Sequence, residues 1–262
     1  MSSKETMETA PVAIIGAGPG DVELITVKGR RLLDEADCIV YAGSLVNRSL
    51  LDGCKADIYD SQGMNLDEII AILSTAWKSG KKVVRLHTGD PSIFGAIKEQ
   101  MQELDALGVP YHVVPGVSSA FGAAASLNAE LTLPEISQTV IITRQEGRTP
   151  VPELEKLHLL ASHQTTMLIF LSVSMVETVV RELIRGGYST DTPVAVVEKA
   201  TWEDETILVG TLDTIASQVD AAGIRKTALI CVGKVFANTE LEAVSKLYDR
   251  SFSHGTRQAS EN

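Results

Sequence analysis

The stretch VAIIGAGPGDVELIT (residues 12–26) decides the fold, because a short apolar run leads directly into three glycines and a proline. The run VAIIG predicts a buried strand, and the residues beyond the glycines predict a helix. A Gly-rich turn at such a junction lets the backbone approach a ligand or a neighbouring segment closely. The stretch therefore predicts an α/β protein whose first turn either lines a binding site or serves structure alone.

Two well-known phosphate-binding motifs do not fit this turn. The dinucleotide fingerprint G-x-G-x-x-G needs a glycine where this chain has Asp21. Pro19 removes a backbone N–H that a pyrophosphate would use, and Asp21 would repel the phosphate charge. No G-K-[ST] follows, so a P-loop is excluded as well. The turn favours an uncharged or cationic ligand and argues against an NAD-dependent oxidoreductase.

Composition limits the class of protein further. The 262 residues are 44% hydrophobic and carry a formal net charge of −11, which predicts a large core and argues against a nucleic-acid or anionic-membrane binder. Cys38, Cys54 and Cys231 show no CxxC spacing, as expected for reduced, mostly buried thiols. No signal peptide and no 18-residue apolar run is present, so we expect a soluble, cytoplasmic protein.

The order of strand and helix patterns indicates two α/β halves. In the first half, strands are predicted at VAIIG (12), CIVYAG (38), KVVRLHTG (82) and YHVVPG (111). In the second half, they are predicted at TVIIT (139), TMLIFLS (166), PVAVVEKA (193), TILVG (206) and ALICVG (228). We predict an N-terminal domain at 11–127, a C-terminal domain at 134–245, and flexible tails at 1–10 and 249–262.

Two helices have predictable ends. In NLDEIIAILSTAW (65–77), Asn65 and Glu68 form a candidate capping box ahead of an apolar face. In SMVETVVRELIRGG (174–187), Ser174 is the expected N-cap, and Gly186 with Gly187 the expected terminators.

Two further predicted strands are each followed by a Gly/Pro turn. These turns are TGDPSIFG (88–95) and PGVSSAFGAAAS (115–126). In an open α/β sheet such turns lie at the carboxyl edge, where ligands bind. Asp90 either faces a cationic ligand or caps a helix that begins near Ser92. Ser118 and Ser119 are either helix caps or donors of hydroxyls to a ligand.

These motifs resemble a known family. GAGPGDxELITVKGxRLL, TGDPSIFG and VVPGVSSAFGA, in this order, are similar to the tetrapyrrole (corrin and porphyrin) C-methyltransferases, which use S-adenosylmethionine, and the resemblance runs from about residue 11 to 236. YAGSLVN (41–47), LPEISQTVIITRQEGRTPVPE (133–153) and GIRKTALICVG (223–233) resemble the members that methylate C-11 of precorrin-4 in cobalamin biosynthesis. EGRTPVPE is more similar to the branch that uses the cobalt form.

The resemblance implies two α/β domains, each with a mostly parallel or mixed sheet flanked by helices, an active site in the interdomain cleft, and a homodimer. The first glycine turn would line a tetrapyrrole trough, and the second and third turns would hold the cofactor, S-adenosylmethionine, whose product is S-adenosylhomocysteine. The implied cofactor contacts are Pro19, Thr88, Gly89, Asp90, Ile93, Ser118, Ser119, Ser172, Ala200, Thr227 and Ala228.

The chain departs from the uroporphyrinogen-III enzymes of the family at two positions. An acid follows the tyrosine of the second strand in those enzymes, whereas Tyr41 is followed by Ala42 here. Ser172 stands where they have a methionine. A carboxylate role at position 42 is therefore not carried over, and the later corrin-pathway function gains support.

Methyl transfer from a sulfonium needs alignment of the reactants more than a protein nucleophile. Arg144 and Arg148 are the expected partners of substrate carboxylates, with solvated surface arginines as the alternative. Arg225 and Lys226 would serve the substrate, the cofactor or neither. The catalytic residue is not identified, and its candidates are Tyr41, Ser44 and Glu146. The alternative for Tyr41 is packing in the core. The alternative for Glu146 is an ion pair with Arg144 or Arg148. The five histidines have no metal-ligand spacing, so no protein-bound metal is predicted.

Three other functions compete with this one. The first is another tetrapyrrole methyltransferase acting on a different ring carbon, or a relative acting on protein or RNA. The second is a non-catalytic binding protein that retains the fold, which the intact TGDPSIFG and VVPGVSS motifs argue against. The third is the NAD-dependent oxidoreductase disfavoured above.

Overall fold

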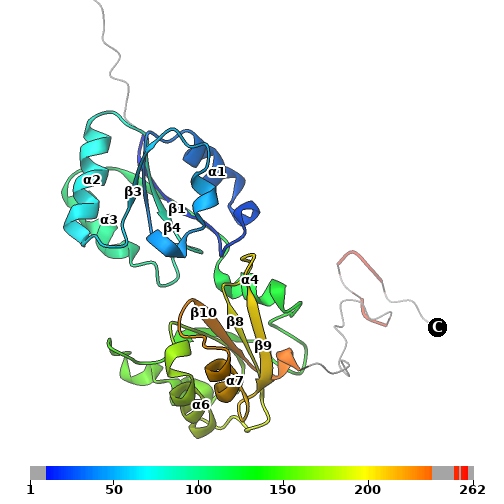
Figure 1. Cartoon of the computed structure of the whole chain (residues 1–262). Helices are drawn as coiled ribbons and strands as arrows, with labels where there is room; N and C mark the ends of the chain where they lie inside the picture. Colours follow the sequence, from blue (N-terminus) through cyan, green and yellow to red (C-terminus); the bar gives the residue numbers. More distant parts are fainter. Residues whose placement is uncertain (1–9, 238–250, 254, 259–262) are drawn as a thin grey trace, which may run out of the picture. The chain divides into compact units, whose positions relative to one another are not determined.

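A computed structural model describes residues 10–237, 251–253 and 255–258 of the chain (Figure 1). The chain divides into two compact units, of which the first runs up to Gly122 and also contains Thr201–Asp204. The second contains Ala123–Ala200 and the chain from Glu205 onward. The predicted domain limits of 11–127 and 134–245 stay a prediction. The predicted tails at 1–10 and 249–262 lie mostly outside the described residues, as do the last residues of the predicted second domain.

The first unit is built on a five-stranded sheet. Its strands are β1 (Val12–Gly16), β2 (Cys38–Tyr41), β3 (Asp57–Asp60), β4 (Val83–His87) and β5 (Tyr111–Val114). Its helices are α1 (Val27–Asp34), α2 (Leu66–Lys78) and α3 (Ile97–Ala106), with short 3-10 turns η1 (Val22–Leu24), η2 (Gly43–Leu45) and η3 (Arg48–Leu51). Helix α4 (Ser119–Ser126) begins in this unit and ends in the second.

All strands of this sheet are parallel, in the order β3-β2-β4-β1-β5. Leu33 of α1 shares one core cluster with Ile15, and Leu104 of α3 shares another with Val83. Helices α1 and α3 lie on opposite sides of this sheet (Figure 1). The neighbouring strands β1 and β4 are therefore followed by helices on opposite faces. Such a switch point opens a crevice at the carboxyl ends of the strands, which is where α/β proteins bind ligands.

Helix α2 forms as its sequence predicts. The Asn65 side chain accepts from the N–H of Glu68, and the Glu68 carboxylate accepts from the N–H of Asn65, which completes the capping box. Ile69, Ile70 and Leu73 are buried against the sheet.

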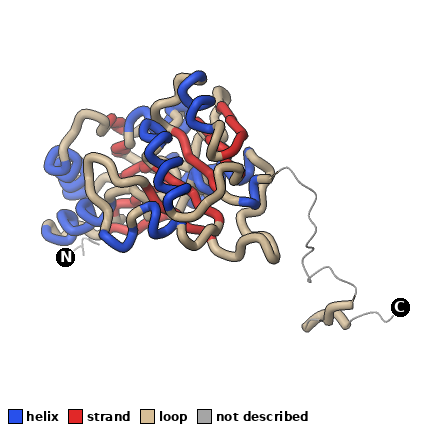
Figure 2. Tube along the Cα trace, turned by 90° about the horizontal axis from the view of Figure 1, so that it is seen from below, coloured by secondary structure: helices blue, strands red, loops and turns tan. Residues whose placement is uncertain are grey.

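The second unit has a five-stranded mixed sheet in the order β6-β7-β10-β8-β9. Its strands are β6 (Val140–Arg144), β7 (Thr166–Phe170), β8 (Pro193–Glu198), β9 (Thr206–Thr211) and β10 (Ala228–Val232). Its helices are α5 (Leu157–Ala161), α6 (Val176–Arg185) and α7 (Ile215–Ala221), with 3-10 turns η4 (Glu153–Glu155), η5 (Val173–Met175) and η6 (Lys234–Phe236). Only β6 and β7 are parallel within it, and the other neighbours are antiparallel. Figure 2 distinguishes the described helices, strands and loops by colour.

One predicted helix end is wrong. Ser174 does not cap α6, because it lies inside the 3-10 turn η5, and Met175 occupies the N-cap position without a side-chain bond. The C-terminal prediction is confirmed: Gly186 is the C-cap, and Gly187 has a φ of 111°. Within the described residues, no helix combines the length and the apolar character that crossing a membrane requires.

Candidate active-site residues at the edge of each sheet

The three glycine turns meet at the carboxyl edge of the first sheet. We call them the first (residues 17–21), second (88–96) and third (115–118) glycine loops. The N–H of Gly89 donates to the carbonyl of Gly18 at 2.8 Å, and the N–H of Gly18 donates to the carbonyl of Gly89 at 3.3 Å. The predicted gathering of these turns at one sheet edge is confirmed.

Glycine is needed here because backbones touch. A Cβ on Gly116 would lie 2.2 Å from the carbonyl oxygen of Gly89, and one on Gly16 would lie 2.6 Å from the Cα of Gly116. Both distances are far below van der Waals contact, so the third loop can lie beside the first two only without side chains at these positions.

Asp90 joins the second loop to the third. Its Oδ2 accepts from the N–H of Gly116 at 2.9 Å, and its Oδ1 accepts from the N–H of Ser92 at 2.8 Å and from the Ser92 hydroxyl. Partial burial alone would raise the pKa of the Asp90 carboxyl, but these hydrogen bonds outweigh it and lower the pKa below its ordinary value. The expected helix near Ser92 is wrong, because α3 begins only at Ile97 and residues 91–94 form a turn.

A segment distant in sequence holds the first loop. The indole N–H of Trp202 donates to the carbonyl of Pro19 at 2.9 Å, and the N–H of Asp21 donates to the Thr201 hydroxyl at 3.0 Å. Asn47 donates to the carbonyl of Gly20 at 2.9 Å. These contacts could not be predicted from local sequence patterns, since they join residues up to 183 positions apart.

The remaining candidates of the first unit differ in exposure. Pro19 is buried, and Thr88, Ile93 and Ser119 are half-buried. Ser118 is buried, and its hydroxyl accepts from the N–H of Ala120 at 3.3 Å, so it acts as the cap that was one of its two expected roles.

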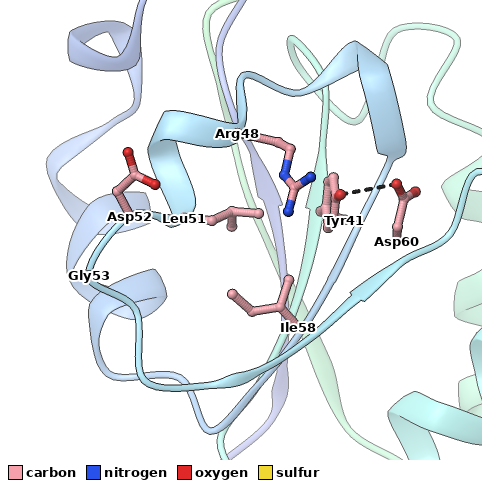
Figure 3. Close-up of a pocket in the computed structure, with 7 residues that line it drawn as sticks. All are labelled: Tyr41, Arg48, Leu51, Asp52, Gly53, Ile58 and Asp60. Atoms are coloured by element: carbon pink, nitrogen blue, oxygen red, sulfur yellow. Dashed lines mark hydrogen bonds between the residues drawn. The ribbon is translucent and has the colours of Figure 1, made fainter.

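Tyr41 lies in a pocket of about 530 Å³ that Arg48, Ile58 and Asp60 also line (Figure 3). Its ring packs in the core, whereas its hydroxyl donates to Asp60 Oδ2 at 3.0 Å. Burial and the Asp60 carboxylate together raise the pKa of Tyr41. The Arg48 guanidinium reaches toward the Tyr41 hydroxyl (Figure 3). Ser44 is exposed.

The pocket contains a carboxylate that the sequence analysis did not predict. Ala42 cannot provide one, but Asp60 does so from the end of β3. The residues of this strand, DIYD, do not form the continuous apolar run that marks a buried strand.

The candidates of the second unit also share one sheet edge. Arg144 pairs with Phe170 at the ends of β6 and β7, and Ala228, at the start of antiparallel β10, pairs with Glu198 at the end of β8. The N–H of Lys199 donates to the carbonyl of Thr227 at 2.8 Å. This edge therefore carries the predicted residues Arg144, Ser172, Ala200, Thr227 and Ala228.

Two of these side chains already have internal partners. The fully buried Ser172 hydroxyl donates to the carbonyl of Phe170 at 2.6 Å and accepts from the N–H of Gln145 at 2.8 Å. The Arg144 guanidinium donates to the carbonyls of Thr149 at 3.1 Å and Pro150 at 2.7 Å, so it orders its own loop.

Other polar candidates are less engaged. Among the residues described, no ion pair links Glu146 to Arg144 or Arg148, and the role of Glu146 stays a prediction. Arg148 is exposed. Arg225 forms an exposed ion pair with Asp220 at 2.5 Å, and Lys226 is exposed. The described residues contain no group of three or more His, Cys, Asp or Glu side chains placed to hold a metal ion.

The fold and these loops define a class: a two-sheet α/β protein that presents Gly-rich strand ends for a small ligand. A model of the family of tetrapyrrole (corrin/porphyrin) methylases matches residues 11–216. The chain belongs to this family.

Its relatives include three proteins of related name. It is 61% identical to the cobalt-precorrin-4 C(11)-methyltransferase of Methanocaldococcus jannaschii, over 95% of this chain and 96% of the relative. It is 47% identical to the precorrin-4 C(11)-methyltransferase of Pseudomonas aeruginosa, over 93% of this chain and 97% of that relative. It is 49% identical to the cobalt-precorrin-4 C(11)-methyltransferase of Priestia megaterium, over 94% of this chain and 96% of that relative.

Two solved structures show the same fold. The X-ray structure of a cobalt precorrin-4 methyltransferase, a cobalamin biosynthetic enzyme, has a TM-score of 0.84 at 50% identity and covers 86% of this chain and 95% of that one. Uroporphyrin-III C-methyltransferase from Thermus thermophilus, complexed with S-adenosylhomocysteine, has a TM-score of 0.74 at 29% identity and covers 89% and 97%. The expected fold class and family are confirmed.

Proposed function

We propose that this chain transfers a methyl group from S-adenosylmethionine to C-11 of precorrin-4 or of its cobalt form, a step of cobalamin biosynthesis. One observation carries the proposal: 61% identity over 95% of the chain to an enzyme named for this reaction. The more identical relatives act, by their names, on the cobalt form, which favours cobalt-precorrin-4 as the substrate.

The residues present fit the cofactor. The three glycine loops carry two carboxylates, Asp21 and Asp90, and no lysine or arginine. Such a surface suits a cationic sulfonium and disfavours a phosphate. The related uroporphyrin-III enzyme complexed with S-adenosylhomocysteine adds support.

We assign the cofactor to the residues that the family resemblance gives. In the first unit these are Pro19, Thr88, Gly89, Asp90, Ile93, Ser118 and Ser119. In the second unit they are Ser172, Ala200, Thr227 and Ala228. When bound, the cofactor supplies an electrophilic methyl group on sulfur.

The protein contributes position rather than a nucleophile. The first loop is held by Trp202, Thr201 and Asn47, and the third loop is held against the second by Asp90. Loops fixed in this way keep bound reactants aligned, and alignment can supply roughly 7–11 kcal/mol of the barrier. Asp90 then acts by shaping the cradle, because its hydrogen bonds to the loops occupy both oxygens.

The substrate is a polycarboxylate, so an acidic protein must meet it with local cations. We assign Arg144 and Arg148 to this role, at the edge of the second sheet. Arg148 is exposed and able to pair with a carboxylate, and Arg144 keeps the loop between them in shape. Tyr41, Ser44 and Glu146 remain the candidates for a catalytic side chain, and the Tyr41 hydroxyl is oriented by Asp60.

We further propose that the enzyme is a cytoplasmic homodimer whose partner is a small tetrapyrrole rather than a nucleic acid or a membrane. The net charge of −11 supports the choice of partner. Light scattering on the purified chain tests the dimer.

The function is tested by incubating the purified protein and S-adenosylmethionine with the pathway intermediate, with and without cobalt. We expect the product to gain one methyl group, located at C-11 by NMR, and to form faster from the cobalt form. A methyl group on another ring carbon would reassign the enzyme within its family. Binding of the cofactor without turnover of either form would favour a non-catalytic binding protein.

A further inference from the structure

Strand β4 carries two polar side chains inside the core. Arg85 and His87 are each only 5% exposed, although β4 lies between two other strands. Because strand residues alternate between faces, both side chains lie on the face covered by α2 and α3. Buried charged residues are rare unless they are paired, so their surroundings call for an explanation.

Arg85 has no carboxylate partner in the part of the chain that the structure describes. Its Nε donates to Gln100 Oε1 at 3.0 Å, and its Nη1 donates to the carbonyl of Val40 at 3.2 Å and to the Ser61 hydroxyl at 3.0 Å. All three acceptors are neutral. Burial lowers the pKa of Arg85 to about 10, and no nearby carboxylate offsets this effect. Its Nη2 has no hydrogen-bond partner among the described residues.

His87 is the second unsatisfied group. Its Nε2 is buried and has no hydrogen-bond partner among the described residues. Burial, together with the positive charge of Arg85, lowers the pKa of His87 to about 3 and outweighs a side-chain hydrogen bond with Gln100 that raises it, so the ring is neutral near pH 7. A neutral ring nitrogen donates or accepts according to its tautomer, so Nε2 is able to donate to a carboxylate.

Both residues line a pocket of about 420 Å³, which we call the Arg85 pocket. The second glycine loop forms part of its wall, through Thr88, Ile93 and Phe94. Phe94 and Ala96 have positive φ values of 52° and 48°, and a Cβ on Gly95 between them would lie 2.2 Å from the carbonyl oxygen of Pro91. Backbone held in such conformations is concentrated at ligand-binding sites.

We propose that the Arg85 pocket is a carboxylate-binding subsite, in which Arg85 and His87 receive one carboxylate side chain of the substrate. The inference rests on the proposed function for the nature of the substrate, but not for the existence of the subsite. A carboxylate supplies the negative charge that Arg85 lacks, and its oxygens can accept from the Nη2 donors. Glu99 also lines the pocket, but it is exposed and forms no ion pair with Arg85.

The subsite can be tested first on the unaltered protein, with propionate as the probe. We label the histidine rings with ¹⁵N, identify the His87 signals by their loss in His87→Gln, and titrate with propionate or with neutral propionamide. Propionate should shift the His87 ring signals in a saturable way, and propionamide should leave them in place. Unchanged signals with both probes, or equal shifts with both, would overturn the proposal.

Paired variants test the subsite in turnover. Arg85→Met removes the buried cation, and Lys98→Met removes an exposed cation from α3 with the same change in net charge. We expect Arg85→Met to raise KM for the tetrapyrrole by about tenfold or more while S-adenosylhomocysteine affinity stays unchanged, because a charge-assisted bond is lost. Lys98→Met should change neither quantity. Equal effects of the two variants on KM would mean that KM responds only to the net charge of the protein, and this result would overturn the subsite.

The two proposals can fail separately. If no C-11 methylation occurs but propionate still shifts His87, the subsite stands and the proposed function falls. If C-11 methylation occurs but propionate leaves His87 unaffected, the function stands and the subsite falls. The propionate titration gives an answer even if Arg85→Met fails to fold.

Discussion

The two sheet edges hold their candidate residues in different ways. At the first edge, backbone touches backbone, as where Gly89 lies against Gly18 and where Gly16 and Gly116 leave no room for a side chain. At the second edge, side chains hold the loops, as where Ser172 bridges Phe170 and Gln145. Backbone contacts cannot adjust to an added atom, whereas a lost side-chain bond costs only that bond. Substitutions that add a side chain at the backbone contacts of the first edge should therefore be more damaging than the loss of one side-chain hydrogen bond at either edge.

The largest effect is expected from Gly116→Ala. The new Cβ would lie 2.2 Å from the carbonyl oxygen of Gly89, so the loops must separate. Overpacking of this kind costs about 3 kcal/mol. We expect urea unfolding to show a loss of that size and calorimetry to show greatly weakened binding of S-adenosylhomocysteine.

Gly63→Ala is the matched control, because a Cβ there meets nothing within 4 Å. It should leave both the stability and the affinity unchanged. If Gly116→Ala behaves like Gly63→Ala, the close backbone contact does not define the first edge.

A smaller loss is expected from Asp90→Asn. The amide nitrogen that replaces Oδ2 cannot accept from the N–H of Gly116, and loss of a hydrogen bond to a charged group costs about 2 kcal/mol. The variant should bind S-adenosylhomocysteine more weakly, because the second and third loops lose their connection. Unchanged affinity would count against a role for Asp90 in shaping the cradle.

The same variant has a distinct pH dependence. Because the folded-state pKa of Asp90 lies below its ordinary value of 3.8, its contribution to stability is present above about pH 4 and is lost as the pH falls through the lowered pKa. Urea unfolding of the wild type should show this decrease in the free energy of unfolding at low pH. In Asp90→Asn, the share of the decrease that comes from residue 90 should be absent.

At the second edge, Ser172→Ala should cost about 1.5 kcal/mol, since the fully buried hydroxyl is lost and the N–H of Gln145 and the carbonyl of Phe170 are left without this partner. Thermal unfolding measures the loss. Ser217→Ala is the control, because Ser217 donates to the carbonyl of Thr214 at an exposed position and should matter little. A Ser172 effect as large as that of Gly116→Ala would remove the contrast between the edges.

The smallest effect is expected from Trp202→Phe, which keeps a ring beside the first loop and removes the bond to Pro19. The loss should be about 1 kcal/mol of stability, with a few-fold weaker S-adenosylhomocysteine affinity. Trp77→Phe removes a similar bond, to the carbonyl of Ala10, away from the loops. It should leave the affinity unchanged, and equal affinities of the two variants would contradict a positioning role for Trp202.

The strands and helices that could be predicted carry strong local signals. Each of these signals depends only on residues close together in the sequence. Examples are the apolar runs of β1, β4 and β7 and the capping box of α2. Strand β3 could not be predicted, because its residues DIYD are all exposed and its pairing with β2 is set by the fold. Ser174 failed as a cap because a 3-10 turn precedes α6, and short-range preferences do not distinguish that turn from a helix start.

The site was predictable where glycine and proline mark it and unpredictable where distant residues meet. The three loops were found from their glycines, but the contacts of Trp202 with Pro19 and of Asp60 with Tyr41 depend on tertiary structure. Arg85 and His87 had a usable signal: two polar residues at alternate positions of an otherwise apolar central strand.

The proposed cofactor residues lie at the edges of both sheets. Hydrogen–deuterium exchange with and without S-adenosylhomocysteine measures which of these edges the ligand covers. We expect slower exchange of the backbone N–H groups in residues 88–90 and 116–119 of the first unit and around residues 200 and 227 of the second. Slower exchange confined to other segments, or to one unit alone, would contradict this assignment.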